Sequence, residues 1–337
     1  MPQAGAVEEE IIYRFKNDDW GYPSMEFGVF IRGAVTYEKM LEFSLGVEEL
    51  DYYGVFLNDH VNGFAESGKE PYLEAWTAIT GLGMQTSKIK VGHITLFNSI
   101  RNPAYLAKSA TALDIMTNGR FELILGAGWA EQEYLGYDFM ERGSGMPSAA
   151  QRVTRLKESV QIIRGMFDNP VFSFEGKYWK LKEAINIPRP VTDYLKISVG
   201  ARQSRMIKIA AKYADGINSS GNLANIERIL GVYHPAIEKL GKTVDDVFIH
   251  GFAPSVWLFD TREDYDVYLQ KQKAAGKDVK AIEEKDFVGT PEVLIEKWRK
   301  AMDLGMTMSV INVRPYNDIS SNLEMLAKFK DEVASQL

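Results

Sequence analysis

Short runs of apolar residues alternate along the whole chain with longer segments that have one apolar face. Residues 25–32 carry Met, Phe, Val and Ile at every second position, which is the period of a β-strand with one buried face. Further short apolar runs with strand-like composition follow at intervals to the end of the chain. The pattern predicts eight strands, at residues 25–32, 54–57, 89–95, 121–126, 195–199, 216–218, 247–259 and 308–313.

The segments between these strands have helical periodicity. From Val153 to Phe167, apolar residues recur at three- and four-residue spacing, which places them on one face of a helix. Another helix begins at Asn102-Pro103, since proline suits a first helical turn, and ends at Asn118-Gly119. The other predicted helices span residues 37–50, 72–86, 203–213, 225–240, 264–274, 291–304 and 323–333.

Eight strand–helix units without a shift in composition predict the α/β class and a closed parallel barrel, the (β/α)8 TIM-barrel fold. An open, doubly wound sheet is the competing architecture. We expect an irregular N-terminal extension over residues 1–24 and one domain over 25–337. Two insertions interrupt the rhythm, a hairpin within 169–190 and a second segment near 276–286.

Composition narrows the function. The 337 residues carry a formal charge of −7 and have no long basic run, so we expect no nucleic-acid partner. No apolar stretch reaches the roughly 18 residues of a membrane span, and the acidic first ten residues do not resemble a signal peptide. The chain has no cysteine, which excludes disulfides, thiolate nucleophiles and thiolate metal sites and fits a cytoplasmic protein.

In a barrel, residues at the carboxyl ends of the strands line a common pocket. His60 is the only histidine that directly follows a predicted strand with a carboxylate, Asp59, beside it. A histidine transfers protons near neutral pH, so His60 is the candidate acid–base residue. The alternative is a loop histidine bonded to a backbone carbonyl. The other three histidines are predicted to be structural, and no metal site is expected.

Two glycine-containing turns are candidates for holding a ligand. Gly126-Ala127-Gly128 would let a flat ring approach the backbone, with Trp129 stacked on it, although a tight turn also explains the glycines. Glu131 and Glu133 are expected to form a solvated helix start. Gly200 to Gln203, which includes Ala201 and Arg202, opens a helix after a strand and would bind a phosphate, unless it is an ordinary turn.

Several segments together resemble one known family. E-A-W-T at 74–77, R-N-P-A-x-L-A-K at 101–108, G-R-F-E-L at 119–123 and G-A-G-W-x-E-x-E-Y at 126–134 are similar in order and spacing to the luciferase-like monooxygenase superfamily. They are most similar to its F420-dependent oxidoreductase branch. Y-A-D-G at 213–216 and V-G-T-P-E at 288–292 match later family segments, so the resemblance covers roughly residues 25–315.

The resemblance implies a barrel, often dimeric, that binds coenzyme F420 or flavin mononucleotide (FMN) at the carboxyl ends of its strands. His60 would lie beside the ring as base or alkoxide partner, and the Ile94-Thr95 peptide would be cis behind it. Gly128 and Trp129 would border the ring. The cofactor-binding residues that the resemblance implies are Asp59, His60, Ile94, Thr95, Gly128, Trp129, Gly200, Ala201, Arg202, Gln203, Ser219 and Ser220.

Three positions depart from the sugar-phosphate dehydrogenases of the family. Phe64 stands where they carry a tryptophan, Trp129 where they carry a catalytic glutamate, and Asn222 where a phosphate-binding lysine is common. We therefore expect a different small-molecule substrate. The favoured hypothesis is hydride transfer between that substrate and F420. The alternatives are an FMN-dependent monooxygenase and a non-catalytic protein that binds a flavin or deazaflavin.

Overall fold

The computed structural model describes residues 25–337 apart from 34, 64–70, 141–142 and 315–317. The expected N-terminal extension, 1–24, and Phe64 lie outside the described residues. Eight parallel strands close into a barrel, because β12 pairs with β1 and β10 pairs with β9. In order around the barrel these strands are β1 (Glu26–Ile31), β2 (Gly54–Leu57), β3 (Lys90–His93), β5 (Phe121–Gly126), β8 (Ile197–Gly200), β9 (Gly216–Ser220), β10 (Phe248–Leu258) and β12 (Met308–Arg314).

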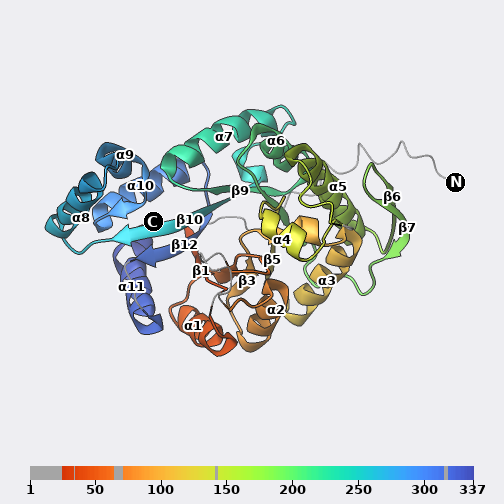
Figure 1. Cartoon of the computed structure of the whole chain (residues 1–337), viewed down its shortest axis with the longest axis horizontal. Helices are drawn as coiled ribbons and strands as arrows, with labels where there is room; N and C mark the ends of the chain where they lie inside the picture. Colours follow the sequence, from red (N-terminus) through yellow and green to blue (C-terminus); the bar gives the residue numbers. More distant parts are fainter. Residues whose placement is uncertain (1–24, 34, 64–70, 141–142, 315–317) are drawn as a thin grey trace.

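Helices surround these strands, as Figure 1 shows, so the prediction of a (β/α)8 barrel is confirmed. Local sequence sets where several of them begin; for example, the Asn102 side chain accepts hydrogen bonds from the first turn of the helix that Pro103 opens. The surrounding helices are α1 (Tyr37–Glu49), α2 (Ala75–Gln85), α3 (Pro103–Met116), α5 (Ala149–Asp168), α6 (Ser204–Tyr213), α7 (Leu223–Glu238), α10 (Pro291–Asp303) and α11 (Ile319–Glu332).

The remaining elements are short additions to this plan. The segment predicted as a hairpin contains the antiparallel pair β6 (Val171–Glu175) and β7 (Lys180–Ile185). Helices α8 (Arg262–Ala274) and α9 (Val279–Lys285) lie together at the left of Figure 1, and β11 (Val288–Gly289) extends the sheet beside β10. The others are α4 (Glu131–Gly136) and the 3-10 turns η1 (Asn98–Ile100), η2 (Val244–Asp246) and η3 (Ala334–Gln336).

The third predicted strand is not continuous. β3 ends at His93, and a separate two-residue strand, β4 (Leu96–Phe97), continues the pairing with β5. The peptide bond between Ile94 and Thr95 is cis, as the resemblance implied. The expectation of one strand over 89–95 was therefore wrong, because apolar composition does not reveal an interruption of the backbone.

Two apolar layers hold the barrel. The large outer core joins the outward-facing side chains of the strands to the helices. A smaller cluster fills the inside of the barrel, where Phe56 of β2, Ile124 of β5 and Val310 of β12 pack together with Ile94 and Met308. The centre of the barrel is therefore closed by side chains, and a ligand would bind above this layer.

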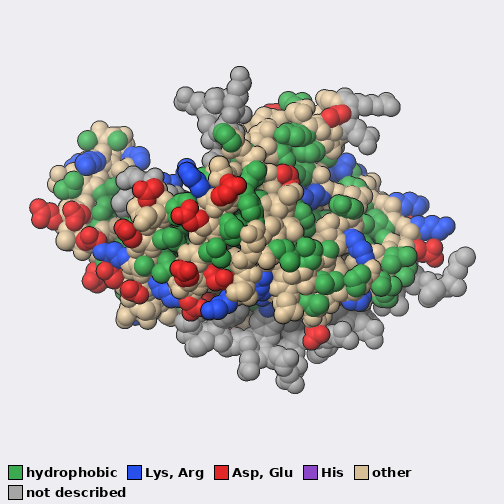
Figure 2. Space-filling view, turned by 90° about the horizontal axis from the view of Figure 1, so that it is seen from below, with side chains coloured by type: hydrophobic (Ala, Val, Ile, Leu, Met, Phe, Trp, Pro, Cys, Tyr) green, Lys and Arg blue, Asp and Glu red, His purple; other side chains and the backbone are tan. Residues whose placement is uncertain are grey.

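The surface is uneven in charge. In Figure 2, which views the molecule from below, acidic side chains gather towards the end that carries α8 and α9, whereas basic side chains are spread over the whole face. Hydrophobic side chains lie across the middle of this face and towards the opposite end, whose tip also carries basic and acidic side chains. Within the described ranges, no helix combines the length and the apolar character that crossing a membrane requires.

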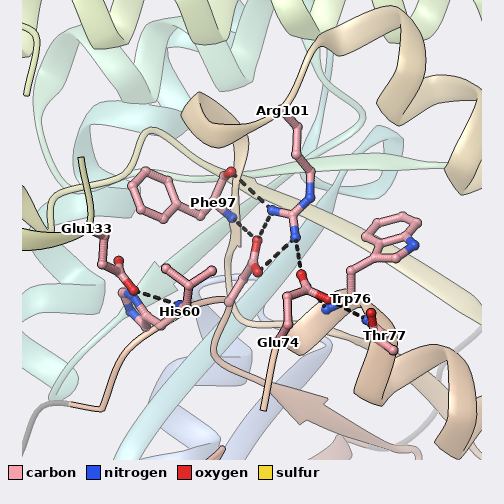
Figure 3. Close-up of polar contacts among 9 residues, drawn as sticks. His60, Glu74, Trp76, Thr77, Phe97, Arg101 and Glu133 are labelled. Atoms are coloured by element: carbon pink, nitrogen blue, oxygen red, sulfur yellow. Dashed lines mark hydrogen bonds and ion pairs between the residues drawn. The ribbon is translucent and has the colours of Figure 1, made fainter. Parts of the chain in front are cut away.

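A buried ion pair anchors the loop that leaves β2 (Figure 3). Asp59 is almost completely buried, and its carboxylate accepts hydrogen bonds from both terminal nitrogens of Arg101 and from the backbone N–H of Phe97, at 2.6 Å. Arg101 also contacts Glu74, whose side chain caps α2. Burial would raise the pKa of Asp59, but Arg101 and these hydrogen bonds hold that pKa below its ordinary value.

Replacing Arg101 with methionine should destabilise the protein by about 3–5 kcal/mol at neutral pH, because the Asp59 carboxylate would stay buried without its cation. The ion pair stabilises the fold above the ordinary aspartate pKa, and its contribution is lost as pH falls through the lowered folded-state pKa of Asp59. The difference from wild type, measured by denaturant unfolding, should therefore shrink as the pH is lowered below about 4.

Lys300→Met is the matched control, since it removes a cation from the exposed Lys300–Glu296 pair and should leave unfolding unchanged. The double variant Asp59→Asn/Arg101→Met should recover part of the lost stability. A pH-independent loss in Arg101→Met would contradict the assigned role.

Candidate active site

The mouth of the barrel is lined by small and amide side chains. Side chains alternate between the two faces of a strand, so a residue two positions after a member of the apolar interior layer faces the same way. By this rule Asn58 follows Phe56, and Asn312 follows Val310, above the interior cluster. Gly126 likewise follows Ile124. Gly200 and Asn218, which are paired, face inward on β8 and β9, because their neighbours Val199 and Ile217 belong to the outer core.

His60 lies beside this layer and is bound to a carboxylate. Its Nδ1 is 2.9 Å from Oε2 of Glu133, the third residue of α4 (Figure 3). The other oxygen of Glu133 accepts hydrogen bonds from the backbone N–H groups of Val61, at 2.7 Å, and Asn62, at 3.1 Å. The loop after β2 and the helix after β5 are thus joined by one carboxylate.

The structure corrects the expectation for Glu133. The acidic sequence at 131–134 predicted a solvated helix start, and Glu131 is indeed exposed. Glu133 instead has a fully buried side chain, because the short helix turns it under the mouth and towards His60. Sequence position gave no signal for this contact, since the two residues are 73 positions apart.

Trp129 is the exposed aromatic residue of the mouth. Its side chain is 63% exposed, and its ring is 5.6 Å from the His60 ring in an edge-to-face arrangement. A large apolar residue left this accessible beside a buried histidine is available to cover a ligand. Its predicted stacking on a cofactor ring is compatible with this position and stays a prediction.

Asp59 is placed differently from the implied cofactor-binding role. Both of its oxygens are engaged by Arg101 and the Phe97 N–H, below the mouth. The residue therefore orients the histidine that follows it, through the backbone that the two share. Nothing in its contacts directs the carboxylate towards a ligand.

The glycines at the mouth make room for protein side chains. A Cβ on Gly126 would lie 2.1 Å from Oγ1 of Thr95, and one on Gly200 would lie 2.6 Å from Cγ2 of the same residue. Gly128 has a φ of +79°, and a Cβ there would meet the Phe97 ring. The tight packing of Thr95 and Phe97 thus accounts for these glycines, and contact between Gly128 or Thr95 and a ring stays a prediction.

The segment from Gly200 to Gln203 leads into α6, as expected. Ala201 is buried and donates its N–H to the Asn218 carbonyl, whereas Arg202 and Gln203 are exposed. Gln203 occupies the N-cap position of α6 and makes no side-chain capping bond. Helix N-termini favour anions, so this end with the Arg202 guanidinium is suited to a phosphate.

Of the two serines on β9, only Ser220 faces the mouth. Ser219 is fully buried and shares the outward face of β9 with Ile217, so the structure does not bring its hydroxyl to the predicted site. Asn218, which is not among the cofactor-binding residues that the resemblance implied, takes the inward position. The alternation of a strand would identify it once the register of β9 is known.

Other predicted positions are structural. Asn222 caps α7 by accepting from the Asn225 N–H, and it donates to Asp286 at 2.8 Å, so its side chain is engaged away from a phosphate. His93 is fully buried and stacks on Trp76, and burial lowers its pKa. Across the described ranges, no group of three acidic, histidine or cysteine side chains is arranged to hold a metal ion.

Two asparagines that face into the barrel carry buried atoms with unused hydrogen-bonding capacity. Oδ1 of Asn58 and Nδ2 of Asn218 are both buried, and neither has a hydrogen-bond partner among the described residues. One is an acceptor and the other a donor, and their strands, β2 and β9, lie on opposite sides of the barrel. Flavins and deazaflavins carry a pyrimidine edge with N–H and C=O groups, which such a pair would satisfy.

Known proteins with similar sequences include a dehydrogenase and a monooxygenase. An F420-dependent glucose-6-phosphate dehydrogenase of Microbacterium testaceum is 27% identical over 302 residues, covering 87% of this chain and 84% of that protein. The pyrimidine monooxygenase RutA of Rhizobium rhizogenes is 25% identical over 331 residues, covering 92% and 88%.

Solved structures share the fold. An F420-dependent secondary alcohol dehydrogenase in complex with an F420-acetone adduct superposes with a TM-score of 0.75 at 17% identity, covering 93% of this chain and 99% of that one. The oxygenating constituent of 3,6-diketocamphane monooxygenase from Pseudomonas putida, in complex with FMN, gives 0.69 at 18% identity, covering 93% and 99%. The sequence profile described as luciferase-like monooxygenase matches residues 25–284. This chain belongs to the luciferase-like monooxygenase family.

Proposed function

We propose that this protein is an oxidoreductase that transfers hydride between a small organic substrate and coenzyme F420. The observation that carries the proposal is the buried His60–Glu133 pair at the mouth of the barrel, beside the exposed Trp129. A relative named as an F420-dependent dehydrogenase, similar over most of its length, supports the choice of cofactor.

The residues at the mouth have different roles in the proposed reaction. When bound, the deazaflavin supplies two-electron chemistry, exchanging a hydride with a substrate carbon. His60 takes the proton that leaves a substrate hydroxyl as the carbonyl forms, or returns it in the reverse direction. Trp129 covers the reacting atoms from water, and the interior apolar cluster closes the site from below.

Separate parts of the mouth would hold the cofactor. Asn58 and Asn218 would bind the pyrimidine edge of the ring, since their buried amide atoms need partners. The N-terminus of α6, with Gly200, Gln203 and the exposed Arg202, would bind the phosphate of the side chain. Ser220 faces the mouth beside this turn.

An FMN-dependent monooxygenase is the second candidate. Its support is the similarity to the protein named pyrimidine monooxygenase RutA, which covers 92% of this chain. The same amide pair would serve the pyrimidine edge of FMN, so the mouth alone does not separate the two rings. We do not assign a sugar phosphate as substrate, because Asn222 is engaged by Asp286 and Trp129 occupies the position of the dehydrogenase glutamate.

Titrating the cofactor-free protein with F420 and, separately, with FMN tests the proposal. We expect F420 to bind more tightly than FMN. Fluorescence or calorimetry measures the two dissociation constants. Asn218→Leu should weaken F420 binding about tenfold, because a hydrogen bond worth roughly 1–1.5 kcal/mol is lost. The same variant without cofactor should be at least as stable as wild type, since it removes a buried amide nitrogen that has no hydrogen-bond partner among the described residues.

Ser219→Ala is the matched control on the same strand, and it should leave the dissociation constant unchanged because Ser219 faces the helices. Tight binding of FMN with no binding of F420 would replace the first candidate with the second. Binding of neither ring would refute both.

We further propose that the enzyme works as a cytoplasmic homodimer. Tyr105 on α3 is 73% exposed, and the carbonyl of Ile187, which follows β7, accepts a hydrogen bond from Lys108 one turn further along α3. Ile187, Met84 and Met116 are also largely exposed. Aromatic and methionine side chains of this kind are enriched in protein interfaces.

Tyr105→Glu should convert the dimer to a monomer, because it places a charge in the proposed apolar interface. Light scattering during size-exclusion chromatography measures the mass directly. Val267→Glu, at an exposed position on α8 at the other end of the molecule, is the control and should not change the mass. A dimer that withstands Tyr105→Glu would place the interface elsewhere.

A further inference from the structure

We propose that Glu133 is a positioning residue that sets which ring nitrogen of His60 exchanges protons with the substrate. The side chain of Glu133 is fully buried, yet it lies at the mouth and contacts the candidate base directly. The inference rests on the proposed function for the identity of His60 as the base. Which ring nitrogen of His60 carries the hydrogen can be measured whether or not the proposed function is correct.

One carboxylate holds three N–H groups of the loop after β2. Oε1 of Glu133 accepts from the backbone of Val61 and Asn62, and Oε2 lies 2.9 Å from Nδ1 of His60. Figure 3 shows Glu133 and His60 pointing towards each other from α4 and from the loop after β2. A buried carboxylate needs such donors, because its charge has no water to solvate it.

These contacts determine the tautomer. An ionised carboxylate has no hydrogen to donate, so Nδ1 of His60 must carry the hydrogen of the bond between them. In the neutral ring, Nε2 then has the lone pair. His60 is therefore prepared to accept a proton at Nε2, which is the state that a general base requires before the substrate hydroxyl is deprotonated.

The carboxylate of the adjacent residue is engaged away from the His60 ring. Asp59, the adjacent residue, is bound by Arg101 and by the Phe97 N–H. The hydroxyl of Tyr137 on the loop after α4 is 3.4 Å from the Val61 carbonyl, so it contacts the same loop through its backbone. Among the hydrogen bonds of the described residues, Glu133 supplies the carboxylate contact of His60.

A purely structural role makes a different prediction from a positioning role. The Oε1 atom of a glutamine would still accept from Val61 and Asn62, so Glu133→Gln preserves the bonds that shape the loop. The amide nitrogen facing His60 would be a donor in place of an acceptor. Glu133→Gln therefore changes the hydrogen on His60 while it keeps the fold.

Nitrogen NMR of protein labelled with ¹⁵N-histidine tests the proposal without any cofactor or substrate. The chain has only four histidines, and the His60→Gln spectrum identifies the signals of His60 by their loss. Above the pH at which the ring is protonated, wild type should show a hydrogen on Nδ1. Glu133→Gln should show the hydrogen on Nε2 instead.

Glu131→Gln is the matched control, because it removes the same charge from an exposed position two residues earlier in α4. It should leave the His60 signals unchanged. A hydrogen on Nε2 of His60 in the wild-type protein would overturn the proposal. This measurement needs only the wild type and the His60→Gln variant that assigns the signals. An unchanged tautomer in a folded Glu133→Gln protein would also overturn it.

Turnover provides the second readout once a substrate is in hand. Glu133→Gln should lower kcat by about 10²–10⁴-fold, because the lone pair faces the wrong way, while KM and the F420 dissociation constant change less than threefold. A folded variant with wild-type kcat would refute the positioning role. If F420 does not bind to wild type, the proposed function fails while the tautomer result stands on its own.

Discussion

The structure at the mouth depends on the burial of two carboxylates on either side of one histidine. Asp59 is held from below by Arg101 and a backbone N–H, and Glu133 reaches the loop from α4, the helix after β5, and binds His60. A buried carboxylate is costly unless every oxygen has a donor, so each of them fixes the backbone that supplies its donors. The position of the candidate base thus follows from electrostatic necessity rather than from the shape of the loop alone.

The barrel places chemically different residues at different heights. The interior is apolar around Phe56, Ile124 and Val310, and the next inward-facing positions are amides and glycines. This change in polarity would give a planar ligand an apolar floor and polar atoms at its edges, where Oδ1 of Asn58 and Nδ2 of Asn218 have no hydrogen-bond partner among the described residues. The strand alternation that builds the core therefore also builds the site above it.

The rhythm of the sequence was enough to predict the barrel, and the position of His60 after a strand was enough to select it as a candidate. Partners distant in sequence were not predictable in the same way. Glu133 sits in an acidic segment that is typical of a solvated helix start, and only the folded chain reveals that it is buried. The resemblance implied Ser219 as a cofactor-binding residue, but the register of β9, which the sequence does not reveal, turns Ser219 outward and Asn218 inward.

The most direct test of the account is turnover by His60→Ala compared with wild type, each loaded with F420 and supplied with a panel of small alcohols and carbonyl compounds. Reduction or oxidation of the bound deazaflavin is followed by its absorbance, and cofactor affinity is measured in parallel. We expect the variant to bind F420 and to lose at least about 10²-fold in kcat. Wild-type turnover by a fully loaded His60→Ala enzyme would contradict the account.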